Sequence, residues 1–370
     1  MQNKLIVLTI TNLAGSGAEK IVLNLFDMFR KFGQNPYIVL LEDVISYTLT
    51  EEQNNKIYKL TKKRKYHKLF SFFGDKILHN KFEKILDFIE KKENKKIDLI
   101  LSNSPSSDRV VYYSQRKNLF NIIHTSYYRE ILEFKKMGKI KRALKKENLY
   151  KKIYENKSLI TVSKSIIQDL DNLKINYKSI DYIYNPFNFE EIREKGEIEI
   201  NDAPKEYLIS ASAFRPVKRH DILLDAYKLL DTEIKLVLLC SEDKELLKMI
   251  EDRSLQNRVI ILGFRKNPYP YIKNAKCLIL SSEREGLPTV LIESLILGTP
   301  VVSTNCISGP NEILIDNLSK YLANVNDSKD LALKINQIMK DKVVIKDECI
   351  DRFNEINIVS QYLELMKNGE

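Results

Sequence analysis

Ten short apolar runs constrain the fold of this chain more than any other feature of its sequence. Val, Ile and Leu fill each run without polar alternation, as in strands that helices cover on both faces. The first series lies at residues 4–10, 36–41, 97–102, 121–126 and 158–163, and the second at 206–212, 235–241, 258–264, 276–282 and 300–305. Helical stretches separate the runs, so these two β/α series predict two doubly wound α/β domains.

The boundary between the two domains is predicted where the apolar runs stop. Residues 185–204 lack such a run and contain Pro and Gly residues, which interrupt helices and strands. We therefore expect a first domain over residues 1–187, a second over 188–354, and a C-terminal helix at 355–370 that packs back on the first. Ligands of doubly wound domains bind at the carboxyl ends of the strands, so two facing domains predict a central cleft.

The composition excludes several classes of protein. Hydrophobic residues make up 44% and charged residues 30%, which is typical of globular chains and not of disordered ones. There is no apolar window of about 20 residues, and the first apolar run is too short for a signal peptide, so we expect a cytoplasmic protein. The cysteines are too dispersed for a disulfide framework or a zinc site, and we expect small buried residues at Cys240, Cys277, Cys306 and Cys349.

Positive charge is concentrated in the first half of the chain. Residues 1–190 contain 35 Lys and Arg against 21 Asp and Glu, whereas the remainder contains 25 against 29. The densest segment, 131–152, has nine basic and two acidic residues interleaved with apolar ones. This segment is either a surface that rests on an anionic membrane or a solvated helix over the core. A second cluster could extend it: Lys62, Lys63, Arg64, Lys65 and Lys68. No nucleic-acid-binding motif is present, so we expect no nucleic acid partner.

The most informative motif is the segment 281–314, SSEREGLPTVLIESLILGTPVVSTNCISGPNEIL. A predicted strand leads into a loop, and Pro288 stands where a first helical turn tolerates it. Gly298 is suited to the left-handed position past the end of the helix. The first amides of such a helix form an anion site for a phosphate or diphosphate. Glu285 and Glu293 bracket the turn, where carboxylates suit the hydroxyls of a sugar or a ribose.

This motif is similar to the signature of retaining glycosyltransferase family 4, whose members have the GT-B architecture of two Rossmann-like domains facing a cleft. The resemblance extends over the whole chain and is strongest from about residue 210 to residue 314. It implies that Glu285 lies by the donor sugar and that Glu293 holds the nucleotide ribose. It also implies that the donor diphosphate is held by the backbone of Gly286, Leu287 and Thr289.

The segment 210–227, SASAFRPVKRHDILLDAY, resembles the second diphosphate element of the same family. In that element an Arg and, five residues later, a Lys neutralise the charge that develops on the departing diphosphate. Lys218 matches the Lys position. The Arg position falls on Ala213, which departs from the pattern. We expect Arg215 or Arg219 to supply the missing charge; the alternative for Lys218 and for Arg215 is a solvent-facing side chain at a helix start.

Three further positions match the family, and for each of them a purely structural role is the alternative to a role in binding. Gly17 belongs to a Gly-containing turn before a predicted helix and resembles the family turn that contacts donor phosphate or acceptor. His124, at the end of a predicted strand, matches a His near the transferred sugar. Phe264, after the strand at 258–264, stands where the family cradles the nucleobase, although a core Phe is the alternative.

The resemblance implies a retaining transfer of a hexose or an N-acetylhexosamine from a nucleotide-sugar, UDP-linked in preference to GDP-linked. The donor is a co-substrate, so no cofactor and no metal are expected, and Asp169 and Asp171 are not taken as a metal site. The expected acceptor is a lipid-linked glycan at the inner face of the plasma membrane, in bacterial surface-glycan synthesis. The alternatives are a nucleotide-sugar 2-epimerase of the same fold and an inactive, nucleotide-binding peripheral membrane protein.

Overall fold

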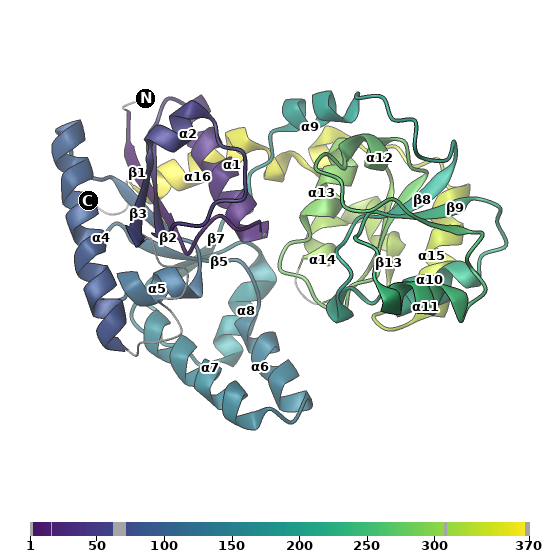
Figure 1. The fold of residues 1–370 in the computed structure, drawn as a ribbon, viewed down its shortest axis with the longest axis horizontal. Coiled ribbons are helices and arrows are strands. Elements are labelled where there is room, and N and C mark those ends of the chain that lie inside the picture. The colour runs from purple at the N-terminus through teal and green to yellow at the C-terminus, as the bar shows by residue number, and fades with distance from the viewer. Residues whose placement is uncertain (1–2, 16, 62–71, 307–308, 367–370) are drawn as a thin grey trace. The chain divides into compact units, whose positions relative to one another are not determined.

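A computed structural model of the chain describes residues 3–15, 17–61, 72–306 and 309–366. The chain divides into two compact units (Figure 1). Unit 1 comprises Met1–Pro186 and Glu355–Glu370, and unit 2 comprises Phe187–Asn354. The basic cluster predicted between residues 62 and 68 lies outside the described residues.

Unit 1 is built on a seven-stranded parallel sheet with the order β3-β2-β1-β4-β5-β6-β7. Its strands are β1 (Leu5–Ile10), β2 (Asn35–Glu42), β3 (Ile57–Thr61), β4 (Leu99–Ser102), β5 (Leu119–Ile123), β6 (Ser158–Thr161) and β7 (Ser179–Tyr182). Its helices are α1 (Gly17–Lys31), α2 (Glu51–Asn55), α4 (Phe72–Glu93), α5 (Pro105–Val111), α6 (Tyr127–Lys136), α7 (Ile140–Tyr154), α8 (Lys164–Asn172) and α16 (Glu355–Leu365). The order reverses between β1 and β4, as in doubly wound folds.

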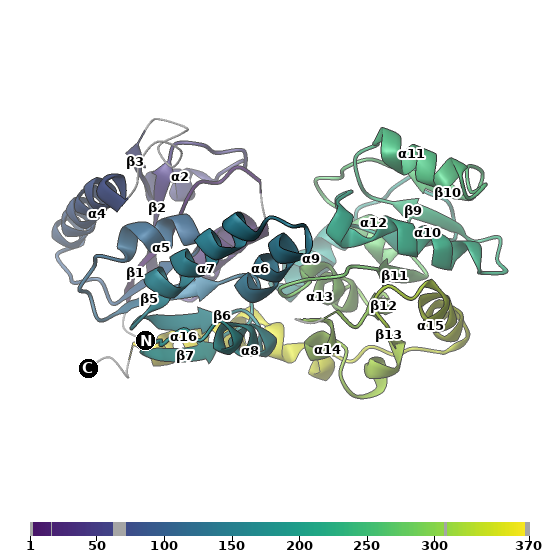
Figure 2. The ribbon, with the colours of Figure 1, turned by 90° about the horizontal axis from the view of Figure 1, so that it is seen from below.

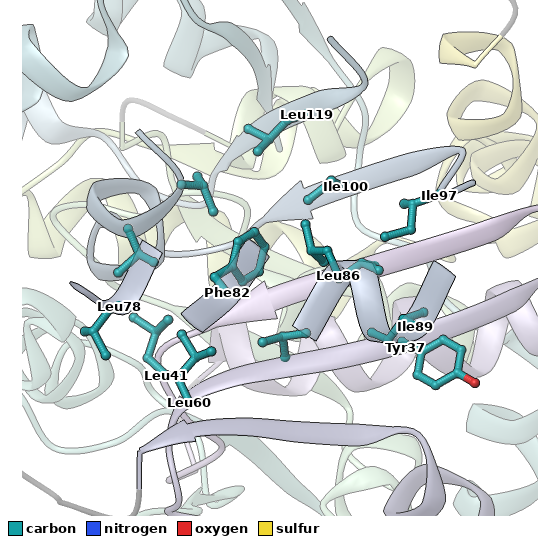
Figure 3. Packing of buried hydrophobic residues seen from close by; sticks show 14 of the residues in the cluster. Tyr37, Leu41, Leu60, Leu78, Phe82, Leu86, Ile89, Ile97, Ile100 and Leu119 are labelled. Atoms are coloured by element: carbon teal, nitrogen blue, oxygen red, sulfur yellow. The ribbon is translucent and has the colours of Figure 1, made fainter. Parts of the chain in front are cut away.

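Helices bury both faces of this sheet, which explains the unbroken apolar runs. Leu5 and Val7 of β1 belong to a cluster that packs against α4 (Figure 3). Phe82 and Leu86 project from α4 into the cluster one helical turn apart. Because alternate side chains of a strand point to opposite faces, Ile6 faces the other way, and it is also fully buried. Burial on both faces therefore requires apolar residues at every position of the central strands.

Unit 2 has a six-stranded parallel sheet with the order β10-β9-β8-β11-β12-β13. Its strands are β8 (Tyr207–Ser210), β9 (Lys235–Leu238), β10 (Val259–Ile261), β11 (Cys277–Leu280), β12 (Val301–Thr304) and β13 (Leu322–Ala323). Its helices are α9 (Phe189–Gly196), η1 (Pro216–Lys218), α10 (His220–Lys228), α11 (Lys244–Glu251), α12 (Tyr269–Lys273), α13 (Thr289–Ile296), α14 (Pro310–Ile313), η2 (Asp316–Tyr321), α15 (Ser328–Lys340), η3 (Asp347–Cys349) and η4 (Asp351–Phe353). Figure 2 shows these helices around the sheet.

After unit 2 the chain returns to unit 1 as α16. The ammonium group of Lys31 on α1 pairs with the carboxylate of Glu355 at the start of α16. The rings of Phe29 and Tyr362 meet edge to face with centroids 5.7 Å apart, and both side chains are fully buried. The last helix therefore completes the core of unit 1.

One sequence prediction needs correction. Cys240, Cys277 and Cys306 are buried as predicted, but Cys349 is partly exposed because it lies in the short turn η3. The basic segment 131–152 is not one continuous helix. It divides into α6 and α7 at Gly138, whose φ of 69° lies in the left-handed region.

Among the residues that the structure describes, no helix combines the length and the apolar character needed to cross a bilayer.

Candidate active site

The candidate site of unit 2 lies where the order of its sheet reverses. β8 and β11 are neighbours, with Ile209 opposite Leu278, yet each continues into an opposite half of the sheet. Segments that follow such a pair of strands diverge and leave a crevice at the carboxyl ends. The two segments that carry the predicted diphosphate residues, 211–219 and 281–288, are the ones that leave these strands.

Lys218 and Glu285 form an ion pair at this position. Lys218 ends the turn η1, and Glu285 lies in the loop between β11 and α13. The Lys218 Nζ atom lies 2.6 Å from the Glu285 Oε1 atom, and the side chains are 23% and 12% exposed. Partial burial strengthens the attraction relative to a pair in open water. The fold thus unites two predicted residues that are 67 positions apart in the sequence.

Hydrogen bonds to backbone carbonyls hold the two segments in place. The amide of Glu283 donates to the carbonyl of Val217 over 2.9 Å, and the Ser281 hydroxyl donates to the carbonyl of Lys218 over 2.8 Å. The Thr304 hydroxyl, at the end of β12, donates to the carbonyl of Ser282 over 2.6 Å. These bonds hold the backbone on either side of the ion pair, so its geometry does not depend on the side chains alone.

The turn after Glu285 leads into the start of α13. Pro288 is the N-cap residue of the helix, and Leu287 before it is buried. The first helical amides, which include that of Thr289, have no acceptor within the helix. The aligned peptide dipoles add partial positive charge there. Gly298 follows the helix with a φ of 79°, in the left-handed region expected for it.

Gly309 packs directly against this turn, and sequence reasoning did not single it out. A Cβ atom at this position would lie 2.5 Å from the Pro288 Cδ atom and 2.9 Å from the Gly286 carbonyl oxygen. Its φ of 108° is also outside the range that other residues adopt readily. The turn at 286–288 therefore depends on the absence of a side chain at residue 309.

Glu293 lies one turn further along α13 and is only 6% exposed. The hydroxyl of Tyr269, the first residue of α12, donates a hydrogen bond to its Oε1 atom over 3.2 Å. Burial of a carboxylate is costly unless hydrogen bonds compensate it, and Tyr269 supplies one. The sequence motif identified Glu293 but gave no sign of Tyr269, which comes from a separate element.

The structure distinguishes the two candidates for the missing arginine. Arg219 has a φ of 51°, and its guanidinium binds both carboxylate oxygens of Asp221, with Nε to Oδ1 at 2.9 Å and Nη2 to Oδ2 at 2.7 Å. Asn326 accepts a further hydrogen bond from it. Arg215, at the N-cap of η1, is exposed and makes no ion pair with any residue that the structure describes. Arg219 is thus held by local contacts, whereas the exposed Arg215 has no ion-pair partner among the described residues.

Phe264 is exposed at 74% and lies in the segment after β10. The structural alternative of a core residue is therefore wrong, because the edge strand β10 ends at Ile261 and the chain has left the sheet by residue 264. Its role toward a nucleobase stays a prediction.

In unit 1, His124 follows directly after β5 and lies next to Asn103, which follows β4. The His124 Nε2 atom is 3.1 Å from the Asn103 Oδ1 atom. Since the Asn103 amide nitrogen already donates to the carbonyl of Leu101 over 2.9 Å, its oxygen is the acceptor and Nε2 carries the proton. The other ring nitrogen, Nδ1, is then free of a proton and can accept a hydrogen bond. Burial lowers the pKa of His124 to about 4, so the ring is neutral near pH 7.

Gly17 is the first residue of α1, and a Cβ atom at its position would meet no described atom within 4 Å. Packing within the described chain therefore does not require glycine there. The neighbouring Gly15 amide donates to the carboxylate of Glu19 in the first turn of α1. An incoming phosphate would have to compete with this carboxylate, and the role of Gly17 stays a prediction.

Asp169 and Asp171 lie on α8. Asp169 is buried near Arg129, with 3.7 Å between Oδ2 and Nε, and Asp171 accepts a hydrogen bond from the Tyr177 hydroxyl over 2.8 Å. Within residues 3–15, 17–61, 72–306 and 309–366, no group of three or more His, Cys, Asp or Glu side chains could hold a metal ion.

Comparison with known protein families gives a match for most of unit 2. The model of the family described as "Glycosyl transferases group 1" matches residues 189–355. This span contains both segments that flank the β8–β11 pair and every residue predicted for the donor in unit 2.

Curated relatives extend the similarity to the rest of the chain. The N-acetylgalactosamine-N,N'-diacetylbacillosaminyl-diphospho-undecaprenol 4-alpha-N-acetylgalactosaminyltransferase of Campylobacter jejuni is 27% identical over 356 residues, which cover 90% of this chain and 89% of that protein. The poly(ribitol-phosphate) alpha-N-acetylglucosaminyltransferase of Staphylococcus aureus is 24% identical over 81% of this chain. The match spans only 62% of the length of the Staphylococcus protein.

Solved structures share the architecture of both units. Anabaena HepE in complex with UDP and glucose superimposes with a TM-score of 0.75 at 18% identity, covering 99% of this chain and 100% of that one. Sucrose-phosphate synthase from Thermosynechococcus elongatus gives a TM-score of 0.76 at 16% identity, covering 99% of each chain. At these identities the similarity concerns the fold alone. This chain shares with the two solved structures an architecture of two Rossmann-like domains.

Proposed function

Since residues 189–355 match the group 1 glycosyl transferases and the chain is a glycosyltransferase of the GT-B fold, we propose that it transfers a hexose or an N-acetylhexosamine from a UDP-sugar to a lipid-linked glycan, with retention of anomeric configuration. The reaction belongs to bacterial surface-glycan synthesis and needs no divalent metal. It takes place at the cytoplasmic face of the plasma membrane.

The observation that carries this proposal is the Lys218–Glu285 ion pair beside the start of α13. Negative charge develops on the diphosphate as the glycosidic bond breaks, and preorganised donors at that point lower the barrier. Lys218 supplies a cation, and the amides of Gly286, Leu287 and Thr289 supply hydrogen-bond donors. When a diphosphate is bound, the ammonium group is shared between it and Glu285, which leaves the carboxylate able to accept a hydrogen bond from a sugar hydroxyl.

The remaining predicted residues receive roles that suit their surroundings. Glu293, buried beside the Tyr269 hydroxyl, accepts hydrogen bonds from the ribose. Arg215 adds positive charge near the diphosphate, in place of the arginine that Ala213 replaces. His124 is neutral and has one ring nitrogen able to accept, which suits a hydroxyl of the transferred sugar.

The relatives support the choice of donor and acceptor classes. HepE has been crystallised with UDP and glucose, and the Campylobacter enzyme is named for an acceptor on diphospho-undecaprenol. A UDP-sugar and a polyprenyl-diphosphate-linked glycan are therefore the substrates that we propose for this chain.

Incubation with UDP- and GDP-sugars and a polyprenyl-diphosphate-linked acceptor tests the proposal. We expect transfer from a UDP-sugar that chelators of divalent metals do not inhibit, and a product whose anomeric configuration matches the donor. Epimerised donor with UDP released in the absence of acceptor would instead indicate an epimerase. Absence of transfer, hydrolysis and nucleotide binding would refute the proposal.

Substitutions with a matched control connect this activity to the site. Lys218→Ala and Glu285→Ala should each lower kcat/KM by about 100-fold or more, as loss of a transition-state donor does. Lys276 and Glu206 form an ion pair of the same 2.6 Å length elsewhere in unit 2, and both side chains are exposed. Lys276→Ala should leave kcat/KM unchanged, and equal losses in all three variants would contradict the assigned roles.

A further inference from the structure

The helices α6 and α7 of unit 1 form a hairpin with a free end. In Figure 1 this end extends away from the unit 1 sheet, and in Figure 2 the two helices lie in front of that sheet. The two helices pack together along their length, with Ile131, Ala143 and Tyr150 buried. At the turn between the helices, by contrast, every residue from Lys135 to Arg142 is exposed.

Three large apolar side chains are exposed at this end. Met137 is 62% exposed, and Ile140 and Leu144 are each 49% exposed. Ile140 and Leu144 are one turn apart on α7, so they lie on the same side of the helix. Met137 is the C-cap residue of α6 and precedes Gly138, where the chain reverses. We call Met137, Ile140 and Leu144 the apolar tip.

Cations surround the apolar tip without acidic neighbours in the sequence. Between Glu133 and Glu147 the chain contains no Asp or Glu. Arg142 lies over the ring of Phe134 at 4.3 Å, and Lys135 reaches Glu147 at 3.4 Å. Four further lysines have no carboxylate partner among the described residues, and we call them the tip lysines: Lys136, Lys139, Lys141 and Lys145.

We propose that this end of the hairpin docks on an anionic lipid bilayer, with the tip lysines at the headgroups and the apolar tip inserted among the acyl chains. Cations alone would suit any polyanion, whereas exposed apolar side chains interleaved with exposed lysines match the two layers of a membrane interface. The inference deepens the proposed function and rests on it, because the proposed acceptor is itself held in a membrane.

Tryptophan reporters test insertion directly, because the chain contains no tryptophan. Met137→Trp and Ile140→Trp each place a single fluorophore at the apolar tip. Leu333→Trp is the matched control, since Leu333 of α15 in unit 2 is exposed to the same 62% as Met137. Vesicles of phosphatidylcholine containing about one third phosphatidylglycerol should shift the emission of the two tip variants to shorter wavelength. They should leave the control unchanged. Sedimentation with vesicles but without a shift at the tip would overturn insertion.

Charge variants test the role of the tip lysines. Each cation near an anionic surface contributes about fivefold to partitioning, so replacing all four by Gln should weaken vesicle binding by roughly several hundredfold. The control replaces four exposed lysines elsewhere with Gln: Lys76, Lys81, Lys244 and Lys248. Equal loss in both sets would overturn the assignment to the hairpin, as would equally strong binding to vesicles of phosphatidylcholine alone.

The vesicle measurements contain neither donor nor acceptor, so their outcome is separate from that of the transfer assay. If the proposed function is wrong, vesicles still shift the tip reporters while no sugar is transferred. If the docking inference is wrong, sugar is transferred to a short-chain acceptor in the absence of vesicles while the reporters do not respond.

Discussion

At the scale of single residues, the Lys218–Glu285 pair keeps an ammonium group partly shielded from water without leaving its charge unpaired. An isolated cation in such surroundings would be destabilising, and the carboxylate compensates it. The same carboxylate is in position to accept a hydrogen bond once a diphosphate shares the ammonium group. The two residues that we propose to act on a bound diphosphate thus compensate each other's charge in its absence.

Gly309 gives a prediction at this scale. Gly309→Ala introduces a Cβ atom 2.5 Å from the Pro288 Cδ atom and must displace the turn that contains Gly286. We expect kcat/KM to fall by about 100-fold while the far-ultraviolet circular dichroism stays unchanged. Gly33→Ala is the control, because Gly33 also has a positive φ but its Cβ would meet nothing within 4 Å. Full activity in Gly309→Ala would show that the turn does not need its present geometry.

His124 gives a prediction about protonation. Burial lowers its pKa to about 4, so its ring should stay neutral from pH 5 to pH 8. In a proton NMR titration, the His124 signal, assigned by its absence in His124→Asn, should not move over this range. A midpoint near 6.5, the usual value for histidine, would contradict the partly buried, Asn103-bonded geometry.

Residues of the candidate site differ in how far the sequence could reveal them. Glu285, Glu293 and Lys218 stand in contiguous motifs with characteristic spacing, so the sequence alone singles them out as candidates. Asn103 and Tyr269 act through contacts with residues from other strands and helices. Such contacts depend on strand order, and nothing in the local sequence around these two residues signals them.

At the scale of elements, a buried carboxyl group joins α5, β5 and α7. Asp108 of α5 is 0% exposed and accepts hydrogen bonds from the Asn121 amide and the Tyr154 hydroxyl, each over 2.7 Å. Burial raises its pKa to about 7. The end of α7 that lies near the sheet is therefore attached through a carboxyl group that holds its proton more tightly than an exposed one does.

This attachment predicts a pH-dependent stability. The folded state binds the Asp108 proton more tightly than the unfolded state, so its contribution is fully present below about pH 4. It is lost as the pH rises through about 7, by a few kcal/mol at most. Asp108→Asn should flatten the dependence of the unfolding free energy on pH in urea titrations. Asp87→Asn is the control, because the Asp87 side chain is 72% exposed. An unchanged slope in Asp108→Asn would contradict the raised pKa.

The strands of the sheets were predictable where both of their faces are covered. Each of the ten apolar runs overlaps an observed strand. The strands that the pattern missed are β3, β7 and β13, and all of them lie at sheet edges. Along β7, exposed residues alternate with partly buried ones, and the exposed ones are Ser179 and Asp181. Edge strands have water on one side, so continuous apolar character is not required of them.

At the scale of the whole molecule, the chain crosses from unit 1 to unit 2 and returns, so that α16 belongs to the core of unit 1. Tyr362→Ala should lower the unfolding free energy of unit 1 by about 3 kcal/mol or more, because it removes a buried aromatic ring that contacts Phe29. In Tyr362→Ala, the backbone amides of α1 should exchange faster than in the unsubstituted chain, whereas those of α10 should exchange at the same rate. Ile356→Ala, on the same helix but 60% exposed, is the control. Loss of protection in unit 2 instead would contradict this assignment of α16.

Titration of UDP and of uridine tests most directly the central claim that Lys218 and the turn at 286–289 hold a diphosphate. Calorimetry on the unsubstituted chain, on Lys218→Ala and on Lys276→Ala separates the diphosphate contribution from that of the nucleoside. We expect Lys218→Ala to bind UDP at least about tenfold more weakly than the other two proteins, and uridine binding to be the same in all three. Equal affinity for UDP in all three proteins would contradict the claim.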